Sequence, residues 1–138
     1  MADCIFCAIV DGEIPGRIVA ETDDALAFLD ANPLAAGHTL VVPREHHERL
    51  HDLSSADSRA VFDLVHDLVP TVEAAVEADG VTVGVNDGTA AGQEVPHVHV
   101  HLVPRFRGDG GGPIHAVAGP RPDLSDDELD AVADRIRG

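Results

Sequence analysis

The sequence predicts a single α+β domain, built on a mainly antiparallel sheet of five strands with two helices. Three short apolar runs precede a long helical pattern, and two alternating runs and a second helical pattern follow it. Apolar residues at every second position are typical of strands, whereas spacings of three and four are typical of helices. The order β-β-β-α-β-β-α therefore indicates an α+β arrangement. The 138 residues show no internal repeat and no domain boundary, so we expect one domain over residues 1–138.

The first half of the chain contains the first three expected strands. Residues 18–20 and 25–29 are apolar runs separated by four polar residues, which predicts a β-hairpin. A loop with an Asn-Pro pair and Gly37 follows. Residues 39–42 are β-branched or apolar and end at Pro43, which predicts a central strand.

A long helix is expected over residues 55–79. The sequence Ser-Ser-Ala-Asp at 54–57 resembles a capping box, and Pro70 is expected to kink or split the helix. A full capping box at 125–128 predicts the start of a short terminal helix after a glycine-rich segment. We therefore expect a core of about residues 4–105, followed by a glycine-rich segment and a helix over 106–138. The apolar stripes of the two helices are Val61, Val65, Leu68, Val72 and Val76, and Leu129, Val132, Ala133 and Ile136.

Residues 97–105 carry the strongest chemical signal in the chain. They follow an expected strand at 81–85, which has one buried face, and a glycine-rich loop at 86–93. Polar and apolar residues alternate along 97–105, which predicts a strand with an open histidine face and a core face. The histidine face would carry His97, His99 and His101, and the core face would carry Val98, Val100 and Leu102.

Three interpretations of the histidine row compete. It could be a solvated strand face, a metal site, or a site of nucleophilic catalysis in which one imidazole attacks and its neighbours position an anionic substrate. Alternate residues on a strand lie about 6.6 Å apart and the outer pair about 13 Å, so two neighbours could bind one ion but three could not. The preceding loop is rich in glycines and backbone amides that can bind an anion, which favours an anionic ligand.

The two cysteines, Cys4 and Cys7, form a Cys-x-x-Cys pair near the amino terminus. A redox pair is expected at a strand-to-helix turn of a βαβ unit, and no such unit is predicted here. The pair could instead be two small buried residues, or half of a zinc site that takes two histidines from elsewhere in the chain. The residues alone leave these alternatives open.

The charge distribution restricts the partners. The formal net charge is −16, from 25 acidic residues against nine basic ones, and all nine are arginines. Acidity spread along the whole chain suggests a surface adapted to high salt, as in halophiles. The chain has no basic stripe for nucleic acid, no apolar run of about 20 residues for a membrane and no signal pattern, so we expect a cytoplasmic protein.

Five motifs follow one another along the chain: Cys-x-x-Cys, Gly37-His38, Asn86, Ala-Gly-Gln at 91–93 and His-Val-His-Val-His. With these motifs in this order, the sequence resembles the histidine-triad (HIT) family of nucleotide hydrolases and transferases. The resemblance covers about residues 4–105 and is strongest to the microbial, Hint-like branch. It implies a five-stranded antiparallel sheet, and a homodimer in which two sheets pair and the helix at 55–79 lies at the interface.

The resemblance also implies roles for individual residues. His99 would attack the α-phosphorus of a nucleotide and form a nucleotidyl-histidine, His101 would bond a non-bridging oxygen, and His38 would lie behind the triad. Asp30 would accept hydrogen bonds from the ribose hydroxyls of an AMP-like purine nucleotide. The other expected nucleotide-binding residues are Asn86, Gly92 and Gln93 near the phosphate, and Ile5, Phe6, Ile18, Phe28 and Leu40 around the base.

A structural zinc ion is the cofactor that the resemblance implies. Its ligands would be Cys4, Cys7, His46 and His97, a closed tetrahedral set, which would make His97 an anchor and leave His99 and His101 for chemistry. His47, His51, His66 and His115 are expected on the surface.

Two departures from the family leave the substrate open. Glu94 stands where Hint-like enzymes often carry a serine, and the chain lacks their aromatic carboxy-terminal segment. Purine nucleoside phosphoramidates, acyl-adenylates and dinucleoside polyphosphates all remain candidates. The alternatives to such a hydrolase are a nucleotide-binding sensor with vestigial catalysis, and a metal hydrolase built on the triad.

Overall fold

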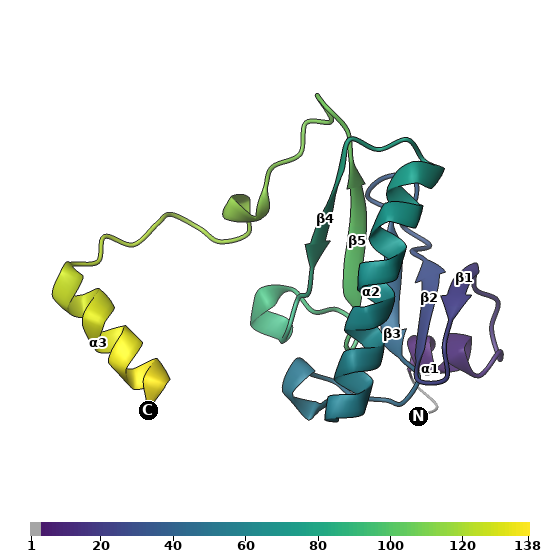
Figure 1. Cartoon of the computed structure of the whole chain (residues 1–138), viewed down its shortest axis with the longest axis horizontal. Coiled ribbons are helices and arrows are strands. Elements are labelled where there is room, and N and C mark those ends of the chain that lie inside the picture. The colour runs from purple at the N-terminus through teal and green to yellow at the C-terminus, as the bar shows by residue number, and fades with distance from the viewer. Residues whose placement is uncertain (1–3) are drawn as a thin grey trace.

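A computed structural model describes residues 4–138 and confirms the α+β class (Figure 1). Strands β1, β2, β3, β4 and β5 form one antiparallel sheet, and the expected hairpin is β1–β2. A helix that the sequence did not predict, α1, precedes the sheet, so the described chain has three α-helices rather than two. The elements are α1 (Ile5–Val10), β1 (Ile18–Glu21), β2 (Ala25–Leu29), β3 (Thr39–Pro43), α2 (Ser55–Ala75), β4 (Gly80–Gly84), β5 (Val100–Arg105) and α3 (Asp126–Arg137).

The strand order is β1-β2-β3-β5-β4, which puts β3 at the centre as its apolar sequence predicts. Neighbouring strands place Ile18 opposite Phe28, Phe28 opposite Leu40, and Leu40 opposite His101. Residues that are directly opposite in adjacent strands share a face of the sheet. One row of side chains therefore leads across the sheet from β1 to the last histidine of the triad.

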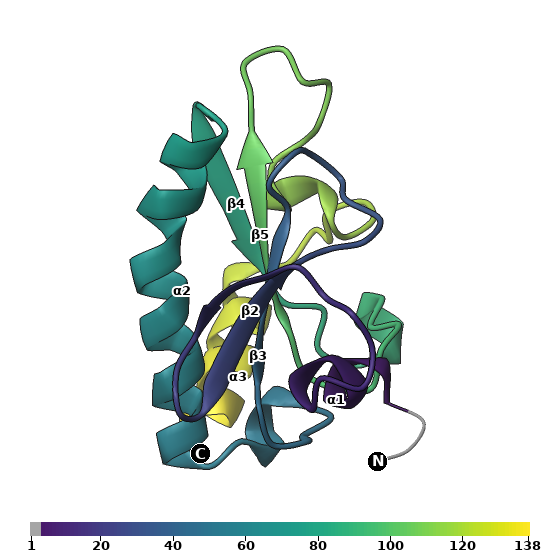
Figure 2. The same cartoon turned by 90° about the vertical axis from the view of Figure 1, so that its right-hand side faces the viewer.

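The two faces of the sheet are covered by different helices (Figure 2). The apolar stripe of α2 packs on one face, against Val41, Val100 and Leu102, and this cluster is almost fully buried. The predicted stripe is confirmed except for its last member, Val76, which lies beyond the end of the helix. On the other face, α1 packs with Phe6, Cys7 and Ile9 against residues of β2 and β3. The histidine side of β5 belongs to this second face, because His101 alternates with the buried Val100 and Leu102.

Helix α2 and strand β4 differ from their predictions. The helix begins at its Ser54 cap as expected but ends at Ala75, and it continues through Pro70 without a break. Proline removes one helical hydrogen bond, and the packing of α2 along the sheet offsets that loss. Strand β4 lies at the sheet edge, so Val83 is 41% exposed and the expected buried face is incomplete.

The carboxy-terminal helix α3 begins at the predicted capping box, where Ser125 and Glu128 satisfy each other's backbone amides. It stands apart from the sheet at the end of an extended segment (Figure 1). Its apolar stripe is therefore exposed, with Ile136 at 81%. None of the described helices is long and apolar enough to span a bilayer.

Candidate active site

The triad lies at the beginning of β5, and its geometry differs from that of a regular strand. The strand begins at Val100, so His97 and His99 belong to the irregular segment that leads into it. The ring centroids of His99 and His101 are 4.9 Å apart, so the two imidazoles contact each other. Val98, Val100 and Leu102 are buried, which confirms the predicted core face.

Helix α1 covers the histidines, so the expectation of an open face is wrong. Phe6 packs edge-to-face on His99 at 5.0 Å and on Phe28 at 5.4 Å between ring centroids. His97 is fully buried and His99 is 7% exposed. The six-residue α1 is too short to show a clear helical period in the sequence, which is why sequence reasoning missed it.

A backbone carbonyl determines the tautomer of His99. Nδ1 of this ring lies 2.8 Å from the carbonyl oxygen of His97. A carbonyl oxygen only accepts hydrogen bonds, so Nδ1 must carry the proton and donate it. In the neutral imidazole, Nε2 then holds the free lone pair, which is the form that a nucleophile needs.

A chain of hydrogen bonds determines the tautomer of His101 in the same way. The backbone N–H of Leu34 donates to Nδ1 of His38 at 3.0 Å, so Nε2 of His38 must carry that ring's proton. Nε2 of His38 donates in turn to Nδ1 of His101 at 3.0 Å. The remaining nitrogen of His101, Nε2, is therefore an N–H donor, and it is buried without a partner among the described residues.

Burial keeps these two rings neutral. Burial, which has the largest effect, and the neighbouring His99 and His38 together lower the pKa of His101 to about 4. Burial also lowers the pKa of His38, against the opposing effect of Asp30, whose carboxylate lies 3.7 Å from Nε2. A buried donor without a partner is costly, so the N–H of His101 is suited to an acceptor that arrives with a ligand.

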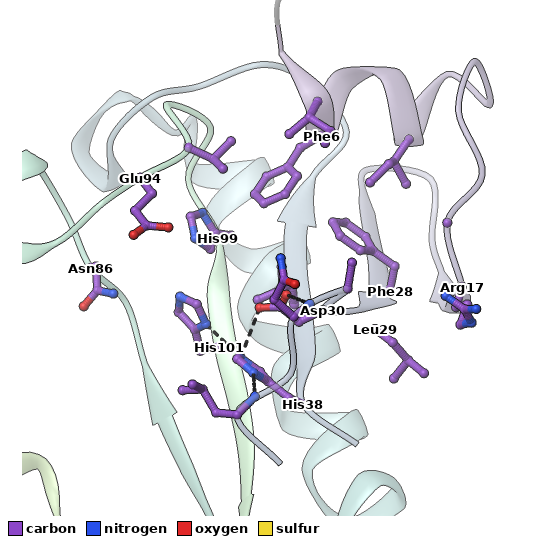
Figure 3. Close-up of a pocket in the computed structure, with 18 of the residues that line it drawn as sticks. Phe6, Arg17, Phe28, Leu29, Asp30, His38, Asn86, Glu94, His99 and His101 are labelled. Atoms are coloured by element: carbon purple, nitrogen blue, oxygen red, sulfur yellow. Dashed lines mark hydrogen bonds and ion pairs between the residues drawn. The ribbon is translucent and has the colours of Figure 1, made fainter. Parts of the chain in front are cut away.

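The histidines open into a cavity of about 470 Å³ with two chemically different ends (Figure 3). Apolar side chains, among them Phe6 and Phe28, form one end, while Asn86 and Glu94 lie at the other, beyond His99. Asp30 lies between the two ends. The structure brings most of the expected site residues to this cavity: Ile5, Phe6, Phe28, Asp30, His38, Leu40, Asn86, Gly92, His99 and His101.

Three expected residues do not line the cavity. His97 is buried behind it, and Ile18 is 45% exposed on β1, one strand beyond Phe28 in the cross-strand row. Gln93 points into the protein: its amide nitrogen donates to the carbonyls of Glu48 and Val95, and its side-chain oxygen accepts from Gly88 N–H. Gln93 thus holds the loop at 88–93 in shape rather than facing the cavity.

The structure adds cavity residues that the sequence did not indicate, among them Arg17, Leu29, Asn32 and Leu34. Most of them lie in loops or at strand ends, where no periodic pattern marks them. His47 also differs from its expected surface position, because it bonds the buried Asp57 at 3.0 Å, whereas His51, His66 and His115 are exposed as expected.

The glycine-rich loop is held by a second brace besides Gln93. The Asp87 carboxylate accepts from Arg49 Nε at 3.1 Å and from the Leu50 backbone N–H at 2.9 Å. The backbone hydrogen bond from Leu50 and the Arg49 guanidinium lower the pKa of Asp87, so it stays ionised. The loop that carries Gly92 to the cavity is therefore fixed at both of its ends.

A compact cluster at the start of the triad is formed by Cys4, Cys7, His46 and His97. Nδ1 of His97 lies 3.4 Å from Cys4 Sγ and 3.5 Å from Cys7 Sγ, and Nδ1 of His46 lies 3.3 Å from Cys7 Sγ. The four ligand atoms all lie within 4.8 Å of one another. Zinc–sulfur bonds of about 2.3 Å and zinc–nitrogen bonds of about 2.0 Å in a tetrahedron give ligand separations close to these.

The surroundings of the cluster suit a cation. Nε2 of His97 donates to the Pro43 carbonyl at 2.9 Å, which leaves the Nδ1 lone pair toward the cysteines. Burial lowers the pKa of His97 to about 4, so the ring is in its neutral, ligating form. Burial and the neighbouring Cys4 raise the pKa of Cys7 to about 11. A metal ion is what would hold such a thiol as a thiolate.

The fold and the site together define a class of protein: a small α+β domain in which one two-ended cavity is lined by a histidine with a lone-pair nitrogen and a histidine with an orphaned N–H donor. The HIT domain model matches residues 11–108, and the chain belongs to the HIT family. A HIT-like protein of Methanocaldococcus jannaschii is 45% identical over 109 residues, which cover 78% of this chain and 82% of the relative.

Two relatives have names that state an activity. Adenosine 5′-monophosphoramidase of Schizosaccharomyces pombe is 38% identical over 133 residues, covering 96% of this chain and 95% of the relative. Adenylylsulfatase of Arabidopsis thaliana is 36% identical over 107 residues, covering 78% of this chain and 54% of the relative.

Solved structures confirm the fold. A protein of Streptococcus mutans aligns with a TM-score of 0.89 at 36% identity, covering 99% of this chain and 85% of that one. A zinc-bound histidine triad family protein of Mycobacterium smegmatis aligns with a TM-score of 0.74 at 31% identity, covering 99% of this chain and 96% of that one.

Proposed function

We propose that this protein is a nucleotide hydrolase or transferase that acts at the α-phosphate through a covalent nucleotidyl-His99 intermediate. The observation that carries the proposal is the pairing of two histidines that line one cavity: His99 has a lone pair on Nε2, and His101 has an orphaned N–H on Nε2. A phosphoryl group needs both, a nucleophile for the phosphorus and a donor for the oxygen that gains charge.

The two ends of the cavity suggest how a nucleotide is oriented. A purine would stack among the apolar side chains at the end formed by Phe6 and Phe28. The Asp30 carboxylate, between the two ends, can accept hydrogen bonds from the ribose diol. The α-phosphate would then reach His99 and His101, and the group attached to it would extend toward Asn86 and Glu94.

The reaction would have two balanced steps. In the first, the lone pair on His99 Nε2 forms a bond to the α-phosphorus while the bond to the leaving group breaks; the leaving group keeps that electron pair and takes up a proton. In the second, a water molecule attacks the same phosphorus and loses a proton, and the phosphorus–nitrogen bond breaks. A nucleoside monophosphate is released and the imidazole is restored.

The comparisons and the cavity support our proposal for the substrate class. The two activity-bearing names, a monophosphoramidase and an adenylylsulfatase, both refer to derivatives of adenosine 5′-phosphate. Together with the apolar end of the cavity they support purine nucleoside phosphoramidates, acyl-adenylates or dinucleoside polyphosphates as substrates. The alternative is a nucleotide sensor that uses the same cavity with vestigial catalysis.

The intermediate can be trapped. We expect a rapidly quenched reaction with an adenosine 5′-phosphoramidate to leave an acid-labile adenylyl group on the peptide that contains His99, detected by mass spectrometry. His99→Asn should bind AMP but form no adduct. If the wild-type protein binds AMP and yet no activated nucleotide gives an adduct, the sensor alternative is favoured.

His38 provides a test of the hydrogen-bond chain. In His38→Ala the Nδ1 of His101 loses its donor, so the ring is no longer held with its proton on Nε2. We expect kcat to fall about tenfold to a hundredfold, as for other outer partners of functional imidazoles, and the ¹⁵N NMR signals of His101 to show mixed tautomers. His38→Gln, whose amide can still donate, should recover part of both effects.

The matched control is His66→Ala, which removes an exposed histidine of α2 and should change neither measurement. AMP binding and the unfolding midpoint of each variant would show whether the buried His38 site is still folded. An unchanged tautomer and an unchanged kcat in His38→Ala would contradict the assigned chain.

We further propose a structural zinc ion on Cys4, Cys7, His46 and His97. The ligand separations and the orientation of His97 support it, as does the zinc-bound relative from M. smegmatis. Bound there, zinc would tie α1 and the segment before α2 to the start of the triad. These four residues form a closed set, so no reaction step passes through the metal.

A homodimer is the assembly that we propose. Strand β4 is at one edge of the sheet, with Val83 41% exposed, and Phe62 of the neighbouring α2 is 42% exposed. An edge strand offers unpaired backbone groups to a second copy, and pairing there would extend the sheet.

A further inference from the structure

Glu94 lies at the end of the cavity where the leaving group would be held. Its carboxylate is on the same side of His99 as Asn86, whereas Phe6, Phe28 and Arg17 lie on the other side (Figure 3). The nucleoside fills the apolar end, so the substituent on its phosphate is directed toward Glu94. Glu94 is exposed and forms no ion pair within residues 4–138, so its charge is not neutralised by the protein.

The charges along the cavity are distributed unevenly. Of the described residues that line it, Arg17 is the one with a permanent positive charge, and it lies at the base end, beyond Phe28. His101 is neutral, as argued above, and the chain contains no lysine. The described residues that line the leaving-group end therefore include a carboxylate but no arginine or lysine, in a protein whose formal net charge is −16.

We propose that Glu94 is a specificity-determining residue that selects leaving groups by charge. Its carboxylate favours a leaving group that carries a positive charge, such as an amine with an ammonium tail, and disfavours an anionic one, such as sulfate or a phosphate chain. This inference rests on the proposed function and narrows it. Of the two activities named among the relatives, it favours phosphoramidate cleavage over adenylyl sulfate cleavage.

Coulomb's law gives the size of the effect. The carboxylate is exposed, so an effective dielectric constant of about 40 is suitable, between about 20 near a protein surface and about 80 in bulk water. A unit charge about 6 Å from the carboxylate then changes an equilibrium or rate constant by about tenfold. Cationic and anionic leaving groups should therefore differ by up to about a hundredfold through Glu94. The effect should shrink as salt is added, because the carboxylate is exposed and screening is strong there.

The test uses three adenosine 5′-phosphoramidates of equal chain length whose amines end in an ammonium, a methyl or a carboxylate group, with adenosine 5′-phosphosulfate as a fourth substrate. We expect the wild-type protein to prefer the ammonium substrate in kcat/KM. In Glu94→Gln the kcat/KM for the ammonium substrate, divided by that for the carboxylate substrate, should fall at least about tenfold. The kcat/KM for the methyl substrate should change less, because its amine carries no charge at the end. Glu94→Arg should reverse the preference.

The matched control is Glu13→Gln, which removes the same charge at an exposed position that does not line the cavity, and it should leave the ratio unchanged. The inference is overturned if the ratio of kcat/KM for the ammonium and carboxylate substrates is the same in the wild-type protein and in Glu94→Gln. An equal loss of kcat/KM on all substrates also overturns it, because that would indicate a general catalytic role. If the wild-type protein cleaves none of the four, the phosphoramidate substrates of the proposed function and the preference inferred for Glu94 are both contradicted. This outcome differs from an unchanged ratio, which requires turnover and overturns only the inference about Glu94.

Discussion

Replacing His99 with alanine should lower turnover of an adenosine 5′-phosphoramidate by at least about a thousandfold, because the variant has no group to form the bond to phosphorus. The His101 N–H and the apolar end of the cavity remain in the variant. AMP should therefore still bind with an affinity within a few-fold of the wild-type value. Steady-state kinetics and isothermal titration calorimetry measure the two quantities separately.

His99→Asn tests the same point without leaving a large hole beside Phe6, which packs on the His99 ring. It should be as inactive as His99→Ala, because an amide nitrogen is a poor nucleophile. His66→Ala, at an exposed position, should keep full activity. Near wild-type turnover in either His99 variant would refute covalent catalysis by this residue.

Loss of the metal is the second change from which we expect a large effect. In Cys4→Ser the cluster lacks one thiolate, so zinc binding weakens, and binding energy at a structural zinc site is also folding energy. A loss of several kcal/mol in a chain of this size should lower the unfolding midpoint by about 10 °C or more. Elemental analysis should show about one zinc per wild-type chain and much less in the variant.

The matched control for the zinc site is Ala8→Ser, which introduces a serine on α1, outside the cluster. It should keep both its zinc and its midpoint. Chelation of the wild-type protein should likewise lower the midpoint, while kcat measured well below that temperature stays within a few-fold. If chelation abolished turnover and left the fold intact, the metal would be catalytic, which would contradict a structural role.

The sequence by itself determined the features that depend on local periodicity and end chemistry. The alternation along 97–105 predicted that Val98, Val100 and Leu102 face the core, and all three are buried. The α2 stripe and the Ser54 and Ser125 caps were predicted for the same reason, because burial and capping are encoded in neighbouring residues. The order of motifs also predicted the family to which the chain belongs.

The tertiary structure decided which groups meet. Whether His97 faces the cysteines or the cavity, and whether Gln93 faces the ligand or the loop backbone, depends on contacts between segments far apart in the chain. The short α1, which packs over His97 and His99, can likewise be recognised only from its packing against β2 and β3 and not from its sequence.

The tautomers of the histidines are the feature that the sequence pattern specifies least. The proton position on His101 depends on His38, which depends in turn on the backbone of Leu34. The proton position on His99 depends on the carbonyl of His97. A repeating pattern specifies which side of a strand a histidine occupies, but only a neighbouring donor or acceptor specifies which of its nitrogens can attack and which can donate.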